Sequence, residues 1–315
     1  MHKRFGYNNP DIGYRNAAVL LQICIINFLA MTTQEKQNDK VWFITGASKG
    51  LGAELVQRLL AEGYRVAATS RKKEALTDAA GNHENFLPLA MDVTSHADVK
   101  AAIERVLERF GRLDVIVNNA GYSQIGTLEE LSDEEVRKNF DVNVFGPLHV
   151  IRNAAPYLRQ QRSGHIFNIA SIGGFVGNFP AFGIYCSTKF AMAGYTEALA
   201  EEMRPFGIHT TLVYPGYFRT NFLAKDSAMV PANPIAEYVN AREVEAQHLN
   251  EINSNQPNDP KKAAEVFIEL SKQAAPPVHF FMGVGASQFA KAKIAVIEQA
   301  LAENLELAES TAISE

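Results

Sequence analysis

The sequence has very few cysteines. Of its 315 residues only Cys24 and Cys186 are cysteine, and they stand far apart without a CxxC spacing. Disulfide-stapled scaffolds and structural zinc sites need several cysteines at short spacings, so neither is indicated. The eight histidines are scattered without an HxxxH pair, and we expect no metal site. The composition favours a reducing compartment, the cytoplasm.

Charge of one sign is also scarce. The chain has 30 Lys and Arg against 35 Asp and Glu, a net charge of −5, and no long run of one sign. A nucleic-acid-binding surface needs a basic patch, so we expect no nucleic-acid partner. Hydrophobic residues make up 47% and charged residues 21%, as in ordinary globular proteins. The length is sufficient for one large α/β domain with a buried core.

A membrane-spanning run is not evident either. Residues 17–31 are mostly apolar and follow a basic flank, the pattern of a signal peptide or anchor. A spanning helix needs about 20 apolar residues, and Gln22 and Asn27 interrupt this shorter stretch. Met31 offers an alternative start with a short polar lead. We therefore expect residues 1–39 to be a non-functional extension and a membrane not to be a partner, with a weak anchor as the alternative.

From residue 40 onward, apolar runs alternate with helical patterns. This order is typical of a parallel sheet covered by helices on both faces, and right-handed crossovers make it a doubly wound, Rossmann-type α/β sheet. We expect a single domain, residues 40–315, with about seven strands. The predicted strands are 41–45, 65–69, 86–91, 113–117, 165–170, 208–214 and 278–282, and the predicted helices are 50–62, 95–110, 132–161, 185–203, 260–272 and 287–308.

Two local signals refine this outline. Ser132 is followed three residues later by Glu135, the spacing of a capping box at a helix start. The segment 222–259 contains three prolines and follows the sixth strand. We expect it to form a lid at the carboxyl edge, where such sheets bind ligands.

A glycine-rich loop, TGASKGLG at residues 45–52, joins the first strand to the first helix. Gly46, Gly50 and Gly52 allow a tight turn and a close approach to a pyrophosphate, and the helix N-terminus offers free N–H groups. The spacing is neither GxGxxG nor GxxxxGK[ST], which disfavours a Walker-type NTPase. A plain glycine turn is the alternative, but its place at the first strand–helix junction favours a dinucleotide site.

The residues at the end of the second strand indicate whether the site would bind NAD(H) or NADP(H). NAD sites place an acidic residue about 20 residues after the glycine loop. Here Ser70 stands in that place and Arg71 follows it, with Lys49 inside the loop. A carboxylate would repel a 2′-phosphate, whereas arginine can bind it bidentately. The sequence therefore predicts NADP(H), with a solvated helix start at residues 71–73 as the alternative interpretation.

Tyr185 and Lys189 are four residues apart in a predicted helix, so they share one face. An ammonium beside a phenol lowers a tyrosine pKa that starts near ~10. The pair can then act as a general acid and base between an alcohol and a carbonyl. Taken alone, the spacing fits a solvated helix face equally well.

Together these motifs resemble the short-chain dehydrogenase/reductase family in its compact single-domain form, over about residues 40–285. The lid and C-terminal helix are similar to branches that include 17β-hydroxysteroid and retinol dehydrogenases. The motifs stand in the family's order: TGASKGLG at 45–52, Asp92-Val93, NNAG at 118–121, Asn143, Ser171, YxxxK at 185–189, and Pro215-Gly216 with Thr220.

The resemblance implies a role for each motif. Tyr185 would exchange a proton with the substrate oxygen, Lys189 would lower its pKa and bind the ribose, and Ser171 would orient the substrate. Asn143, at a helix kink, would hold a water. Subunits would pair through the helix of Tyr185 as a homo-oligomer. The implied cofactor contacts are Gly46, Ser48, Lys49, Gly50, Leu51, Gly52, Arg71, Asp92, Val93, Asn119, Ala120, Gly121, Tyr185, Lys189, Pro215, Gly216 and Thr220.

These observations predict an NADP(H)-dependent oxidoreductase that interconverts a ketone or aldehyde with an alcohol, on a hydrophobic small molecule. Apolar residues at 172–184 and 217–223 would line its pocket or pack beneath the lid. One alternative is a non-catalytic NADP(H)-binding sensor or scaffold, which has no need of Ser171, Tyr185 and Lys189 together. Another is a membrane-anchored lipid or retinoid reductase, which depends on residues 17–31.

Overall fold

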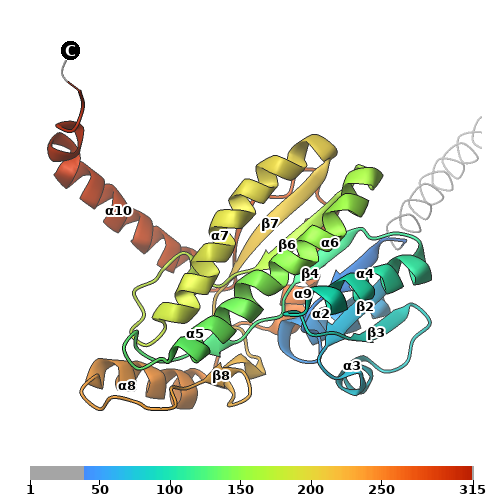
Figure 1. Ribbon diagram of the computed structural model, residues 1–315, viewed down its shortest axis with the longest axis horizontal. Coiled ribbons are helices and arrows are strands. Elements are labelled where there is room, and N and C mark those ends of the chain that lie inside the picture. Colours follow the sequence, from blue (N-terminus) through green and yellow to red (C-terminus); the bar gives the residue numbers. More distant parts are fainter. Residues whose placement is uncertain (1–38, 314–315) are drawn as a thin grey trace, which may run out of the picture. The chain divides into compact units, whose positions relative to one another are not determined.

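A computed structural model describes residues 39–313 of the chain. The expected N-terminal extension up to residue 38, with its apolar segment, lies outside the described residues. A seven-stranded parallel sheet runs through the domain in the order β3-β2-β1-β4-β6-β7-β9 (Figure 1). The expected doubly wound sheet is thus confirmed. Its strands are β1 (Val41–Ile44), β2 (Arg65–Ser70), β3 (Phe86–Ala90), β4 (Val115–Asn118), β6 (Gly164–Ile169), β7 (Ile208–Pro215) and β9 (His279–Met282).

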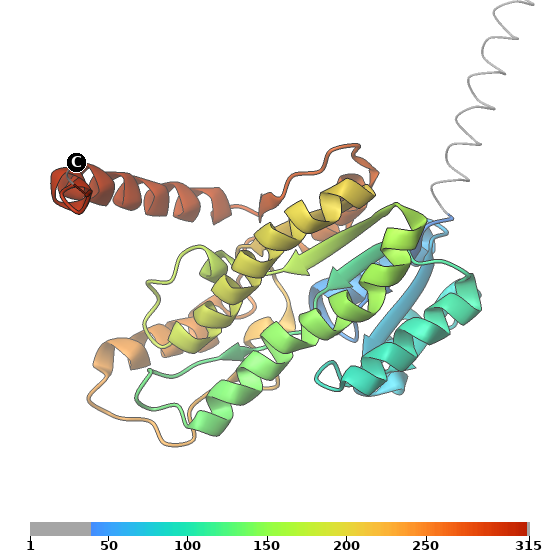
Figure 2. The ribbon, with the colours of Figure 1, turned by 45° about the horizontal axis from the view of Figure 1, so that its top comes forward.

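Helices cover both faces of this sheet (Figures 1 and 2). In β1, Trp42 and Ile44 pack into one apolar cluster and Val41 and Phe43 into another. All four are fully buried, which explains why the strand is apolar at every position. The first cluster takes side chains from α2 (Gly50–Ala61) and α9 (Pro260–Lys272), and the second from α4 (His96–Phe110), α6 (Gly146–Gln161) and α7 (Gly183–Met203).

The helical region predicted at 132–161 is divided in three. It consists of α5 (Asp133–Phe140), the π-helical turn η1 (Asp141–Phe145) and α6. The predicted capping box is confirmed, because the Ser132 hydroxyl accepts from the Glu135 N–H at 3.3 Å and the Glu135 carboxylate accepts from the Ser132 N–H at 2.8 Å. Helix α3 (Lys73–Ala80) was not predicted. Leu76 is its one buried residue, so the sequence there has almost no apolar periodicity.

The segment expected to form a lid contains β8 (Ala228–Met229), α8 (Val239–Ala246) and the π-helical η5 (Gln247–Ile252). β8 pairs with β5 (Ser123–Gln124) in a two-stranded sheet that the sequence did not indicate. The buried Glu130 carboxylate also accepts from the Ile235 N–H and from Arg242, both at 2.8 Å. Burial acts to raise the pKa of Glu130, but the hydrogen bonds and the charge of Arg242 outweigh it and lower this pKa. The segment is therefore held to β5 and to the loop that follows it.

The C-terminal helix α10 (Ala286–Glu309) extends away from the sheet (Figure 2). Ala286 and Ala290 are its buried residues, and most of the others are exposed. Within residues 39–313, no helix has both the length and the apolar character required to cross a bilayer.

The packing of α9 on the sheet gives a test of the fold. Phe267 is 2% exposed, and its ring meets that of Phe167 edge-on at 5.5 Å between centroids. We predict that Phe267→Ala lowers the free energy of unfolding by about 3–5 kcal/mol, because it opens a cavity between helix and sheet. Urea unfolding would measure this. Leu301→Ala, on a residue 66% exposed in α10, is the matched control and should change stability by less than about 0.5 kcal/mol. Equal losses of unfolding free energy in the two variants would contradict the buried packing of Phe267.

Candidate active site

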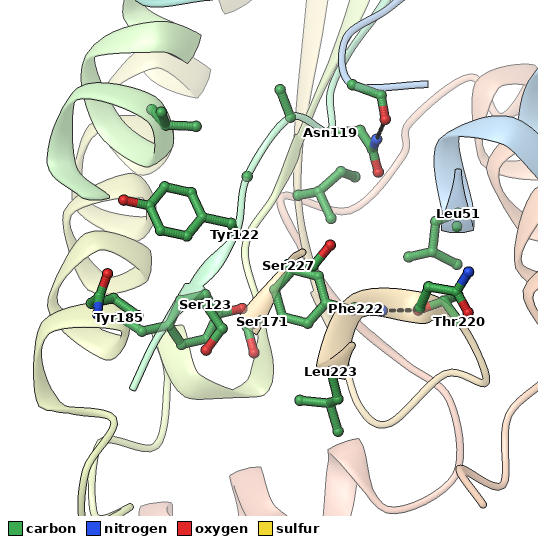
Figure 3. Close-up of a pocket in the computed structure, with 18 of the residues that line it drawn as sticks. Leu51, Asn119, Tyr122, Ser123, Ser171, Tyr185, Thr220, Phe222, Leu223 and Ser227 are labelled. Carbon is green, nitrogen blue, oxygen red and sulfur yellow. Dashed lines mark hydrogen bonds between the residues drawn. The ribbon is translucent and has the colours of Figure 1, made fainter. Parts of the chain in front are cut away.

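A cavity of about 570 Å³ lies at the carboxyl edge of the sheet, and Figure 3 gives a close-up of residues that line it. Tyr122 and Tyr185 lie on one side of it and Phe222 and Leu223 on the other. Most of the residues predicted for the site come together here. Those that line the cavity are Gly46, Ser48, Lys49, Gly50, Leu51, Arg71, Asp92, Val93, Asn119, Ala120, Gly121, Ser171, Tyr185, Lys189, Pro215, Gly216 and Thr220.

Gly52 and Asn143 do not line the cavity. A Cβ atom on Gly52 would lie 2.6 Å from the Asn119 side-chain nitrogen. The lack of a side chain at Gly52 therefore allows the first turn of α2 to pack closely on the loop after β4. Asn143 is also fully buried, behind the cavity wall.

The glycine loop is held firmly to the end of β4. The Thr45 hydroxyl accepts from the N–H groups of Asn119 and Ala120, both at 3.0 Å. In return the Asn119 amide donates to the Thr45 and Gly46 carbonyls, both at 2.9 Å. Gly46 has φ +64°, and a Cβ there would stand 2.6 Å from the Ala120 Cα. Only glycine fits here, so the loop lies close against the end of β4, and the first residues of α2, Gly50 and Leu51, line the cavity.

Two cations stand beside this loop. Lys49 and Arg71 both line the cavity, and Lys49 pairs with Asp226 of the lid segment. The hydrogen bond from Lys49 lowers the pKa of Asp226, and the charge of Arg71 contributes. The sequence analysis missed Asp226, because no motif or periodicity distinguishes it in a proline-containing segment.

Asn143 lies in the π-helical turn between α5 and α6. Its amide nitrogen donates to the Tyr122 carbonyl at 2.9 Å and to the Thr188 hydroxyl at 3.1 Å. Its amide oxygen accepts from the Tyr122 N–H at 3.1 Å. The side chain thus joins the loop after β4 to α7, one residue before Lys189.

Tyr185 and Lys189 share a buried face of α7. The Lys189 ammonium donates to the Ile169 carbonyl at 2.8 Å and lies 5.9 Å from the centre of the Tyr185 ring. Across the cavity, the Phe222 ring is 6.0 Å from that of Tyr185. The carboxyl end of β6 thus brings Ser171 and Lys189 to the same part of the cavity as Tyr185.

The pKa values of this pair differ from the sequence-based expectation. Burial lowers the pKa of Lys189 to about 7. Burial also raises the pKa of Tyr185 above its ordinary value, although a hydrogen bond with Ser171 opposes the rise. Lys189 was expected to lower the pKa of Tyr185, but here desolvation of the phenolate is the larger effect. The phenol is therefore protonated at neutral pH and can donate its proton.

The apolar segments show both of the expected roles, because Phe179, Phe182 and Phe222 line the cavity and also pack in one cluster with Ala241 of α8. Phe179 and Phe182, with Tyr217, Phe218, Phe222 and Leu223, line the cavity. Phe175 does not, because its ring packs against Tyr214 and Phe281. Lining residues that the sequence analysis did not name for the site include Ser123, Cys186, Asp226, His248 and Gln256.

The described residues favour neither a cysteine nucleophile nor a metal ion at this cavity. Burial raises the pKa of the Cys186 thiol to about 11, so the thiol is not a ready nucleophile at neutral pH. Across residues 39–313, no group of three or more His, Cys, Asp or Glu side chains is arranged to hold a metal ion.

Comparisons with known proteins agree with this geometry. A family model described as "short chain dehydrogenase" matches residues 40–231. The oxidoreductase BOA17 of Botryotinia fuckeliana is 36% identical over 255 residues, which cover 80% of this chain and 91% of the relative. A 3-ketodihydrosphingosine reductase of Bacteroides thetaiotaomicron is 42% identical over 183 residues, which cover 58% of this chain and 65% of the relative.

Solved structures agree as well. A crystal structure of a short-chain dehydrogenase from Streptomyces avermitilis has a TM-score of 0.80 and 34% identity, covering 87% of this chain and 99% of that one. Both cofactors occur among more distant structures. A 3-ketoacyl-(acyl-carrier-protein) reductase from Brucella melitensis was solved with NADH (TM-score 0.67, 26% identity, covering 80% and 99%), and ElxO with NADP (0.65, 27%, covering 79% and 99%).

The low pKa of Lys189 predicts a pH-dependent stability. A lysine with a pKa of about 7 when folded and ~10.4 when unfolded binds fewer protons in the folded state between these values, so stability rises with pH across this window. From pH 7 to pH 9, the ligand-free protein should gain about 2 kcal/mol in free energy of unfolding relative to Lys189→Met. Urea unfolding of both proteins at the two pH values would measure this. If the free energies of unfolding of the two proteins changed equally with pH, Lys189 would be charged in the folded protein, contrary to this prediction.

Proposed function

The chain belongs to the short-chain dehydrogenase/reductase family, oxidoreductases acting on CH–OH groups, and we propose that it is an NADP(H)-dependent enzyme that interconverts a ketone or aldehyde with an alcohol on a hydrophobic substrate. The observation that carries the proposal is the buried Tyr185 hydroxyl, hydrogen-bonded with Ser171, in an apolar-walled cavity whose other part holds Lys49 and Arg71. One end suits proton transfer to a carbonyl, and the other suits a dinucleotide phosphate.

The residues fit a nicotinamide dinucleotide, which supplies the hydride when bound. The cradle at Gly46 has no room for a side chain, and the open N–H groups at the start of α2 suit a pyrophosphate. Asp92 and Val93, Asn119 to Gly121, and Pro215 to Thr220 would complete the binding site. Lys49 and Arg71, which both line the cavity, support a 2′-phosphate, and this phosphate would replace the exposed Asp226 carboxylate as the partner of Lys49.

In reduction, Tyr185 would donate its proton to the substrate oxygen as the oxygen gains negative charge. The Ser171 hydroxyl would hold that oxygen in place. Lys189 uses one N–H on the Ile169 carbonyl, and its other hydrogens remain for the ribose and for the phenolate that forms. Asn143 would keep α7 and the loop at Tyr122 in register, and the aromatic walls would exclude water.

The remaining proposals concern the compartment, the lid, the assembly and the substrate of the protein. The free thiol of Cys186 is buried and the chain is poor in cysteine, which supports a reducing cytoplasm. We propose that segment 222–259 acts as a lid and that the protein works as a homo-oligomer. A relative named as a 3-ketodihydrosphingosine reductase supports a ketone as the substrate.

The catalytic role of Tyr185 separates an enzyme from a sensor that only binds NADPH. We predict that Tyr185→Phe lowers kcat about 100-fold or more, because the proton donor is lost, while the NADPH dissociation constant changes less than about twofold. NADPH absorbance over a panel of ketones and aldehydes would measure turnover, and NADPH fluorescence would measure binding. A wild-type protein that binds NADPH and consumes none would favour the sensor. Undiminished turnover in the variant would remove Tyr185 from the mechanism.

Cofactor preference depends on Arg71. We predict that Arg71→Ala raises the dissociation constant of NADPH about tenfold or more, since it removes a charge-assisted hydrogen bond to the 2′-phosphate, and hardly changes that of NADH. Lys72→Ala is the matched control, because this neighbouring cation does not line the cavity. Titration calorimetry would give all the constants. If Arg71→Ala weakened both cofactors equally, the phosphate-binding role would be wrong.

A further inference from the structure

Tyr217 and His248 form a hydrogen-bonded pair in the cavity wall. Tyr217 follows Pro215-Gly216 after β7, and His248 belongs to η5 of the lid segment. Both residues line the cavity, and the Tyr217 hydroxyl lies 2.9 Å from the His248 Nε2. His248 is only 6% exposed. Neither residue belongs to the proton-transfer set of Ser171, Tyr185 and Lys189.

The proton positions in this pair follow from its partners. The His248 Nδ1 lies 2.8 Å from the Val244 carbonyl oxygen, which can only accept, so Nδ1 carries a hydrogen. Burial lowers the pKa of His248, and the ring is neutral at pH 7. Its Nε2 is therefore bare and accepts the hydrogen of the Tyr217 hydroxyl. Because its hydrogen is used in this bond, the Tyr217 oxygen can only accept a hydrogen bond from a ligand.

The pair lies beside the reacting centre. The Phe182 ring is 4.5 Å from the His248 ring and 6.5 Å from the Tyr185 ring, so it contacts both from one side. Tyr217 is also among the groups whose charge raises the pKa of Tyr185. The surrounding wall of Phe179, Phe182, Phe222 and Leu223 is apolar. In that wall, the Tyr217 oxygen is a hydrogen-bond acceptor with a fixed orientation.

We propose that Tyr217, oriented by His248, accepts a hydrogen bond from a hydroxyl or amino group on the carbon next to the reacting carbonyl. The substrate class would be apolar α-hydroxy or α-amino ketones, with vicinal diols or amino alcohols as the reduced products. This inference rests on the proposed oxidoreductase function and deepens it. Tyr217 is then a specificity-determining residue, because a buried acceptor left without a donor disfavours the analogue that lacks the hydroxyl or amino group.

Three matched ketones test the inference: 3-hydroxydecan-2-one, decan-2-one and 3-methoxydecan-2-one. The first offers a donor, the second nothing, and the third only an acceptor. With NADPH, the wild-type kcat/KM should be at least about fivefold higher for the hydroxy ketone than for either of the others. Tyr217→Phe should bring the hydroxy-to-plain ratio close to one, with most of the change in KM.

Tyr238→Phe is the matched control. Tyr238 lies in the same lid segment but not in the cavity wall, and its hydroxyl donates to Glu129. This variant should keep the wild-type ratio. A ratio near one in the wild type, a ratio unchanged by Tyr217→Phe, or equal preference for the methoxy ketone would overturn the inference. Turnover of decan-2-one in any of these cases leaves the proposed function standing.

Binding measurements keep the two proposals separate. If none of the three ketones is reduced, titration calorimetry on the NADPH-bound protein still ranks their affinities. Tighter binding of the hydroxy ketone, lost in Tyr217→Phe, would support the subsite, and the failed turnover would count against the proposed function alone. Equal binding of all three would overturn the subsite.

Discussion

The side-chain amide of Asn143 joins the segments from which the site is built. Its nitrogen donates to the Tyr122 carbonyl at 2.9 Å, and its oxygen accepts from the Tyr122 N–H at 3.1 Å. The nitrogen also donates to the Thr188 hydroxyl on α7. Asn143 itself lies in a π-helical turn, a distortion often found at functional sites. The loop after β4, the turn before α6 and the helix of Tyr185 are therefore fixed together. A buried amide that is satisfied in this way fixes these segments to one another and leaves neither of its own polar atoms unpaired.

A second set of contacts brings the lid segment to the cavity. Asp226 pairs with Lys49 beside the glycine loop, Glu130 holds Ile235 and Arg242, and His248 bonds to Tyr217. These are polar contacts between the segment and the rigid edge of the sheet. The exposed pair of Lys49 and Asp226 contributes little to stability by itself, whereas the buried Glu130 carboxylate would be costly to leave unpaired. The contacts of segment 222–259 therefore differ in strength, and the exposed pair of Lys49 and Asp226 is weaker than the buried contact at Glu130.

Much of the fold could be predicted from the sequence, because it depends on regular patterns. Continuous apolar strands and amphipathic helices identified the parallel sheet, and the capping box at Ser132 marked the start of α5. Most of the residues that the motifs predicted for the site also line the cavity. What the sequence could not show depends on long-range contacts. The pairing of β5 with β8 involves two residues on each strand, and Asp226 and His248 come from a segment without periodicity. Desolvation of Tyr185 likewise arises only when α7, the Phe222 segment and the sheet close around it.

If the site works as proposed, NADPH bound in this cavity supplies a hydride to a carbonyl carbon while Tyr185 protonates the oxygen. The most direct test supplies NADPH deuterated at the transferable C4 position together with a hydrophobic ketone, and analyses the alcohol by mass spectrometry. The expected product is an alcohol that carries one deuterium on the carbinol carbon. A protein that binds the labelled cofactor but releases no labelled alcohol from any ketone in a broad panel would contradict it.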